Sequence, residues 1–157
     1  MIPQKTYTFD EAQKKLEFYC AYQERCHKEV HQKLKSMRMI PEAIDLIVVS
    51  LIRQDYLNES RFARIFTQGK FKIKKWGRVR ITRELKYRDI SEYNIKLAMK
   101  EIPEDEYINS LDELALKRFH QIKESNVFKR KKKLVDYLLY RGWESHLVYE
   151  KVNTLIK

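Results

Sequence analysis

The apolar residues of this chain recur in three similar sets, which are offset from one another by about 51 to 53 positions. Each set begins with two aliphatic residues four positions apart: Val30 and Leu34, Ile81 and Leu85, and Leu134 and Leu138. A spacing of four residues places both side chains on one face of an α-helix. The pattern therefore predicts a helical repeat, although amphipathic helices can also imitate repeats by chance.

A turn and a second apolar stripe follow each of these pairs. The stripes are Ile44, Val48 and Leu51; Ile95, Met99 and Ile102; and Val148, Val152 and Leu155. Each unit is thus predicted to contain a longer helix, a short helix, a tight turn and a third helix. We expect the units at residues 1–56, including an N-terminal segment, at 57–102 and at 103–157. No long or glycine-rich linker separates them, so they should pack in sequence as an extended all-α array.

Local signals support helices joined by short loops. Glycine and proline occur three times each, which argues against a turn-rich β-protein. The helix signals are a capping box from Thr8 to Glu11, a first-turn proline at Pro41, N-caps at Asn58 and Ser91, an interruption at Gly77 and a helix stop at Gly142.

The positive charge of the chain is concentrated in two blocks. Residues 61–88 hold eleven basic residues and one acid, and residues 117–133 hold eight basic residues and one acid. Between them, residues 89–116 hold two basic and eight acidic residues, and the whole chain carries +11. One reading is a set of solvated helix faces. Two such blocks in a small chain favour binding to a polyanion, and nucleic acid above all.

The candidate contacts to phosphate are the cations that lie off the predicted core face. On the helix after Gly77, Arg80, Arg83 and Lys86 can point outward, and Arg78 stands in the first turn, where free N–H groups favour an anion. The alternative is that these cations pair with the acidic block. Trp76 could stack on a base, but we favour packing at a helix corner. The full candidate set is Lys70, Lys72, Lys74, Lys75, Arg78, Arg80, Arg83, Lys86, Lys129, Lys132 and Lys133.

No pattern in the sequence indicates catalysis, a metal or a cofactor. His27 and His31 could bind zinc on one helix face, but no second ligand cluster has suitable spacing, so we interpret them as a solvated pair. Cys20 and Cys26 are expected on different faces of one helix, which disfavours a mutual disulfide.

No apolar run approaches the ~18 residues of a membrane span, and the start of the chain lacks the apolar core of a signal peptide. We therefore expect a cytoplasmic protein.

Three segments of the chain carry motifs of a specific kind. The most specific runs from Asp55-Tyr-Leu-Asn-Glu-Ser-Arg61-Phe-Ala-Arg64 through Lys74-Lys-Trp-Gly77 to Ile81-Thr-Arg-Glu-Leu85 and Arg88-Asp-Ile-Ser91. The others are Leu138-Leu-Tyr-Arg-Gly-Trp143 and the pattern of Glu24, Arg25, Glu29, Val30, Lys33 and Leu34. These segments resemble the RecX family, the regulatory proteins of the RecA recombinase. The resemblance covers roughly residues 16–152.

This sequence departs from the family pattern at several turn glycines. Lys75 replaces the first glycine of the aromatic-glycine turn, Asp55 replaces the glycine before Tyr56, and the first unit has Met37 and Arg38 where a glycine is common. We interpret Lys75 as a sign that its position needs no positive φ.

The resemblance implies a curved, elongated molecule of tandem three-helix repeats that is not an enzyme. It implies binding within the groove of the RecA filament, inhibition of ATPase and strand exchange, and contact with single- or double-stranded DNA. We expect a monomer. Two alternatives remain from the residues alone: a non-specific nucleic-acid-binding module without a recombinase partner, and a structural adaptor that uses its helices for protein contacts.

Overall fold

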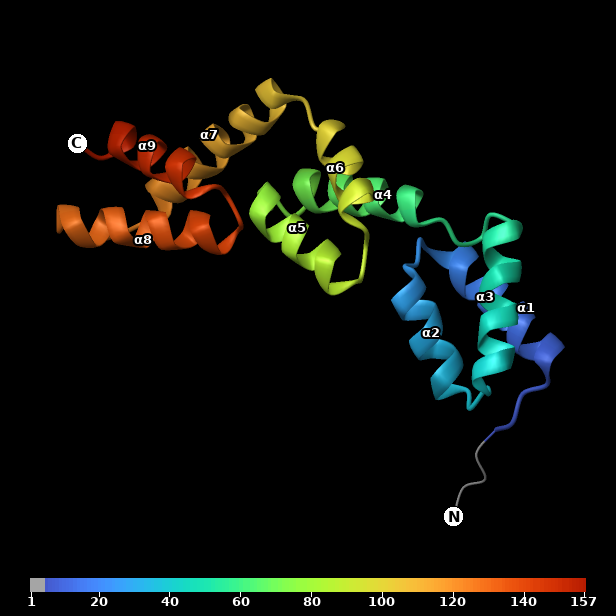
Figure 1. The fold of residues 1–157 in the computed structure, drawn as a ribbon. Helices are drawn as coiled ribbons and strands as arrows, with labels where there is room; N and C mark the ends of the chain where they lie inside the picture. The colour runs from blue at the N-terminus through green and yellow to red at the C-terminus, as the bar shows by residue number, and fades with distance from the viewer. Residues whose placement is uncertain (1–4) are drawn as a thin grey trace, which may run out of the picture.

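The computed structural model describes residues 5–157, which form nine α-helices and no strand (Figure 1). The all-α prediction is therefore confirmed. Residues 1–4, part of the segment predicted to lack a signal peptide, lie outside the described residues. The helices are α1 (Phe9–Tyr22), α2 (His27–Ser36), α3 (Pro41–Arg53), α4 (Glu59–Lys72), α5 (Arg78–Tyr87), α6 (Glu92–Lys100), α7 (Glu104–Gln121), α8 (Val127–Tyr140) and α9 (Ser145–Leu155).

The helices pack as three consecutive triplets, which we call the first, second and third units. The main helix–helix contacts lie within α1–α3, within α4–α6 and within α7–α9. Figure 1 shows the triplets following one another in chain order, so the molecule is an elongated array. The boundaries that we propose, after residues 56 and 102, fall between α3 and α4 and between α6 and α7. In the third unit the second helix, α8, has 14 residues and is not short.

The helix starts follow the local signals in the sequence. The Thr8 side chain caps α1, with Glu11 completing the capping box. Asn58 and Ser91 cap α4 and α6 through their side chains. Pro41 occupies the first turn of α3, as predicted.

The repeated aliphatic pairs form the centres of the units. Both members of all three pairs on α2, α5 and α8 are fully buried. The stripes on α3, α6 and α9 are buried too, apart from Met99 and Leu155, which are half-buried. Burying one aliphatic side chain contributes about 1.5–3 kcal/mol, so this recurring apolar face is what specifies the three units.

The buried side chains divide into two cores that do not match the three units one to one. Most buried side chains of the first unit form their own core around Leu16, Leu34 and Leu51, whereas Cys26 packs in the other core. The second and third units share one larger core, which includes Phe71, Tyr107 and the fully buried pairs of α5 and α8. The second and third units therefore behave as one packed body, to which the first unit is attached.

Tight backbone approach joins the second unit to the third. The N–H of Gly77 donates to the carbonyl oxygen of Arg141 and the N–H of Val79 to that of Gly142, both at 2.9 Å. A Cβ on Gly77 would lie 2.6 Å from the Cα of Trp143, which no real side chain tolerates. Gly142 follows the end of α8 and has φ of 94°, the left-handed conformation that is common where a helix ends. It was predicted as a helix stop.

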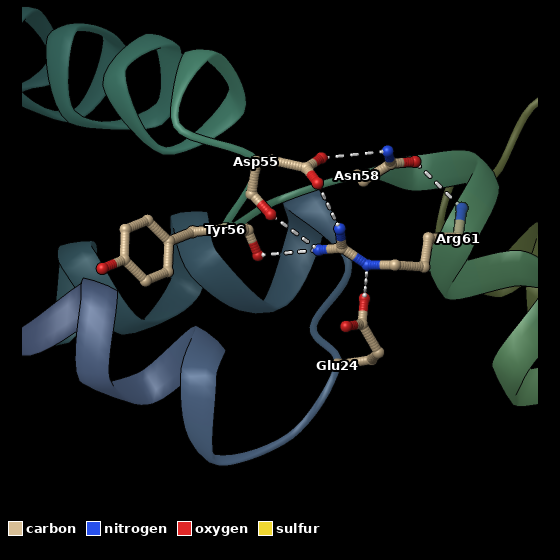
Figure 2. A network of polar contacts seen from close by, with 5 residues as sticks. All are labelled: Glu24, Asp55, Tyr56, Asn58 and Arg61. Atoms are coloured by element: carbon tan, nitrogen blue, oxygen red, sulfur yellow. Dashed lines mark hydrogen bonds and ion pairs between the residues drawn. The ribbon is translucent and has the colours of Figure 1, made fainter.

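Arg61 holds the joint between the first and second units (Figure 2). Its Nε donates to Glu24 at 2.8 Å, and its Nη atoms reach the Asp55 carboxylate and the Asp55 carbonyl oxygen, each at 3.0 Å, and the Tyr56 carbonyl oxygen at 3.3 Å. Asn58 accepts from the Arg61 N–H and donates to Asp55. The hydrogen bond to Glu24 raises the pKa of the Arg61 guanidinium. The segment from 55 to 61 is thus a connector built around one side chain.

The prediction that Lys75 needs no positive φ is wrong. Lys75 has φ of 58°, and Arg38, Asp55 and Asp89 lie between 60° and 61°. These left-handed conformations close the turns between helices, where Cβ clashes with the backbone for any residue other than glycine. Several positions where the family pattern has glycine therefore have a positive φ in this chain, although a residue other than glycine occupies them.

Candidate nucleic-acid interface

The outer side of α5 and its neighbour α6 form a basic surface on the second unit. Because Ile81 and Leu85 face the core, Arg83 and Lys86 are left exposed on α5. Lys86 also borders a groove of about 400 Å³ whose other wall is α6, with Lys96, Met99 and Lys100. We call the four cations Arg83, Lys86, Lys96 and Lys100 the α5–α6 basic face.

The charges of the α5–α6 basic face have no ion-pair partners in the part of the chain that the structure describes. Among residues 5–157, none of these four side chains forms an ion pair. Glu92 is the acidic side chain in the groove that Lys86, Lys96 and Lys100 border. Unpaired cations around an apolar floor can bind an anionic surface without breaking internal contacts.

Lys96 and Lys100 were missed in the sequence because they belong to the block with net negative charge. Their spacing of four residues, opposite the buried Ile95 and Ala98, places them together on the exposed side of α6. Helical phase rather than block charge was the signal that could have found them.

The end of α4 and the turn that follows it carry a second group of predicted cations. Lys72 and Lys74 are exposed and Lys75 is half-buried. The ammonium of Lys70 lies 5.4 Å from the centre of the Phe66 ring and 5.0 Å from that of Trp76. Lys70 is therefore held against aromatic rings, whereas the next two lysines extend into solvent.

Arg78 joins two units instead of remaining free for an outside anion. Its guanidinium forms ion pairs with Glu144, at 3.0 Å, and with Glu104, and lies 3.7 Å from the Tyr107 ring centre. Its backbone N–H, which was predicted to favour an anion, donates to the Tyr107 hydroxyl at 2.8 Å. Tyr107 donates to Glu144, and burial raises the pKa of this tyrosine. Arg78 therefore follows the alternative interpretation, in which a cation of this helix pairs with the acidic block, here through Glu104.

Arg80 does not extend outward with Arg83 and Lys86. Its guanidinium lies 4.1 Å from the Trp76 ring centre and 4.9 Å from that of Tyr140. Trp76 is half-buried and packs against the shared core, which agrees with our preference for a corner role. Arg80 and Trp76 therefore belong to the junction between the second and third units.

The lysines of α8 form a separate group. Lys129, Lys132 and Lys133 are exposed, but Lys132 pairs with Asp136 at 2.8 Å and Lys133 with Glu124 at 3.4 Å. The hydrogen bond to Asp136 raises the pKa of Lys132. Since α8 ends beside α5, Lys129 lies ~18 Å along the helix from that junction. The structure thus does not bring all the predicted cations onto one face.

The cysteines and histidines have ordinary structural surroundings. Cys20 lies in α1 and Cys26 precedes α2, so the prediction that both lie on one helix is wrong: the chain turns after Tyr22. Both thiols are free and buried, and burial raises the pKa of each to about 11. Burial lowers the pKa of His27. In the described residues, no three His, Cys, Asp or Glu side chains gather as a metal site would require.

A helix must be both long and apolar to cross a bilayer. Within residues 5–157, no helix combines the length and the apolar character that a membrane crossing requires.

Two parts of the chain match domains of a known protein family. Residues 58–99 match the second three-helix domain of RecX, and residues 104–152 match its third three-helix domain. Together the two matches cover more than half of the chain, and they coincide with α4–α6 and α7–α9.

Relatives that are themselves regulatory RecX proteins extend the similarity into the first unit. A regulatory protein RecX of Clostridium acetobutylicum is 32% identical over 123 residues, covering 76% of this chain and 56% of that protein. One of Lactobacillus gasseri is 28% identical over 138 residues, covering 86% of this chain and 51% of that protein. The chain thus spans about half the length of the curated relatives it matches.

Solved structures support the fold. A crystal structure of regulatory protein RecX superposes with a TM-score of 0.83 at 23% identity, covering 93% of this chain and 73% of that one. The crystal structure of RecX from Lactobacillus salivarius superposes with a TM-score of 0.80 at 20% identity, covering 94% of this chain and 96% of that one. The arrangement of three-helix units is therefore shared with these proteins.

Proposed function

Because the chain belongs to the RecX family of regulatory proteins, we propose that it binds the RecA recombinase filament and inhibits its ATPase and strand-exchange activities. It would act in the cytoplasm, as a monomer, in recombination and DNA repair. It would work by binding and not by catalysis, with no cofactor. The observation that carries this proposal is the α5–α6 basic face, whose four cations have no internal ion-pair partner among the described residues.

The proposed mechanism is electrostatic docking of an elongated molecule into a groove of acidic protein and DNA backbone. Phosphate and carboxylate groups would be bound by Arg83, Lys86, Lys96 and Lys100, supported by Lys72 and Lys74 from the neighbouring turn. An array three units long can contact successive subunits of a filament at once. Such bridging would resist the subunit motion that ATP turnover and strand exchange require.

The proposal is tested by titrating the protein into RecA filaments on single-stranded DNA while ATP hydrolysis is followed at fixed salt. A binding curve with bare DNA is measured at the same salt. We expect hydrolysis to fall at protein concentrations well below those that coat bare DNA. Unchanged turnover at saturating protein would refute the proposal.

The basic face is tested by the double variant Arg83→Glu with Lys86→Glu. We expect roughly a tenfold increase in the concentration that gives half-maximal inhibition, because both charges face the partner. The matched control is Lys14→Glu with Lys35→Glu, which makes the same change of charge at exposed positions of α1 and α2. Circular dichroism checks that both variants fold. Equal losses in the two variants would mean that only net charge matters.

The alternative function is a non-specific nucleic-acid-binding module without a recombinase partner. The concentration of unpaired cations supports it as well, and it predicts that log affinity for DNA falls steeply with log salt. Inhibition that appears only as bare DNA becomes saturated would favour this alternative.

A further inference from the structure

A stack of cations and aromatic rings crosses the junction between the second and third units. Lys70 lies 5.0 Å from the Trp76 ring centre, and Arg80 lies between Trp76 and Tyr140, at 4.1 and 4.9 Å. Arg80 also donates to the carbonyl oxygen of Tyr140 at 3.3 Å. The Tyr140 ring is thus held on one side by Arg80, yet the residue is 72% exposed.

A second stack lies next to the first on α8 and α7. The Tyr137 ring has Arg118 at 4.6 Å and Arg141 at 5.2 Å from its centre. Lys133, Tyr137, Tyr140 and Arg141 follow one another at spacings of four, three and one residues, which places them on one side of α8 and its C-cap. The two stacks therefore present neighbouring rings on a common side of one helix.

A surface groove of about 680 Å³ runs along these rings. It is lined by the two tyrosines, by Arg118, Lys123 and Lys133, and by Gln121, Ile122 and Asp136. Aromatic rings thus line the groove, and cations from α7, α8 and the loop between them border it.

The arginines of the two stacks carry charge that nothing in the described chain neutralises. Among residues 5–157, Arg80, Arg118 and Arg141 form no ion pair. Arg141 instead donates to the Lys74 carbonyl oxygen and Arg118 weakly to Gln121. Three uncompensated guanidinium groups beside an exposed ring favour a ligand that is both anionic and aromatic.

We propose that this groove binds single-stranded nucleic acid, with Tyr140 as the stacking platform for a base and Lys133, Arg118 and Arg141 close to the phosphates. Alternating cations and aromatic rings fit a strand whose bases are free to stack. In a duplex the base faces are covered by their neighbours, and an acidic peptide offers charge without flat rings. The inference rests on the proposed function, because it specifies which form of DNA the regulator contacts and where.

The test uses the full chain and three fluorescent probes of equal length, followed by polarisation at one salt concentration. The probes are a single-stranded oligodeoxynucleotide, its blunt duplex and an abasic strand that keeps the phosphates. We expect Tyr140→Ala to weaken binding of the single strand about tenfold, the effect of losing one stacked base. Binding of the duplex and of the abasic strand should change less than twofold.

Two further variants separate stacking from other effects. Tyr140→Phe keeps the ring and should bind the single strand as the unmodified protein does. Tyr22→Ala removes a tyrosine of similar exposure, 74%, from α1 and should have no effect. Since Tyr140 is largely exposed, circular dichroism should show an unchanged fold.

The inference is overturned if Tyr140→Ala leaves single-strand binding unchanged, or weakens all three probes equally. It is also overturned if polyglutamate competes as well as the abasic strand and Tyr140 has no influence, which would indicate an acidic protein partner. Inhibition of RecA ATP hydrolysis by the unmodified protein is measured separately. If inhibition persists while the Tyr140 prediction fails, the site is wrong and the proposed function stands.

Discussion

Single residues in this chain keep a backbone conformation that favours glycine. Lys75, with φ of 58°, is one such case, because lysine has no side-chain oxygen that could stabilise a left-handed turn as the short polar side chain of aspartate can. The turn is nevertheless fixed, since the carbonyl oxygen of Lys75 accepts the Trp143 Nε1–H at 3.1 Å. Packing at the junction therefore maintains a conformation that the residue itself disfavours.

Replacing this lysine should stabilise the protein. We expect Lys75→Gly to raise the free energy of unfolding by about 0.5–1 kcal/mol, because relief of the Cβ clash exceeds the entropy that glycine adds to the unfolded chain. Urea denaturation measures the change. Lys75→Ala is the control, since it removes the same charge but keeps the Cβ. A similar gain in the alanine variant would show that charge, and not backbone conformation, was the cause.

The sequence shows residue type at such positions but not φ. That is why the absence of glycine at Lys75 suggested an ordinary turn, and why Arg78 and Arg80 resembled outward cations. Their helical phase is compatible with exposure, but Glu144 and Tyr140 reach them from the third unit, more than 55 positions away in the chain. A contact partner so distant leaves no trace in the local pattern.

At the scale of elements, local signals in the sequence determined the helices and distant contacts determined the joints. The caps of α1, α4 and α6 depend on residues three positions apart, so they could be predicted. The contact of Gly77 with Gly142 joins turns 65 positions apart, and only the unusual choice of glycine hinted at it.

Gly69 in α4 and Gly77 at the N-cap of α5 give a matched pair for testing this joint. We expect Gly77→Ala to reduce the free energy of unfolding by about 3 kcal/mol or more, because its Cβ would displace the backbone at Gly142 and Trp143. Gly69 lies inside α4, and a Cβ there meets nothing within 4 Å. Gly69→Ala should therefore stabilise by about 1 kcal/mol through helix propensity. Thermal unfolding of both variants checks the contrast, and a mild effect at Gly77 would contradict the close packing.

At the scale of the whole molecule, the two joints of the array differ in kind. Backbone hydrogen bonds, Trp143 and a continuous core hold the second unit to the third. Apart from Cys26, the buried side chains of the first unit form a separate core. A cleft of about 400 Å³ between the first and second units is lined by Glu24, Lys28, Phe66 and Arg88 among others. Bending of the array should therefore occur mainly at the first joint.

Arg61 is the side chain that should control this bending. Hydrogen bonds of charged groups contribute about 1.5–3 kcal/mol each in favourable settings, and the Arg61 side chain is only 23% exposed. We expect Arg61→Ala to accelerate hydrogen exchange at the Tyr56, Leu57 and Phe62 amides by about tenfold or more, since local opening of the connector becomes easier. Exchange at the Gly77 and Val79 amides should stay unchanged, because they bond across the other joint.

Arg53→Ala is the matched control for this prediction, because Arg53 is an exposed arginine at the end of α3, just before the connector. It should leave exchange at both joints as in the unmodified protein. If Arg61→Ala accelerated both joints equally, the array would open as one cooperative unit and the first unit would not be a separately attached body. If only the first joint responds, a regulator of this shape can adjust the angle of its first unit to a filament while the second and third units, which carry the basic face and the aromatic groove, keep their geometry.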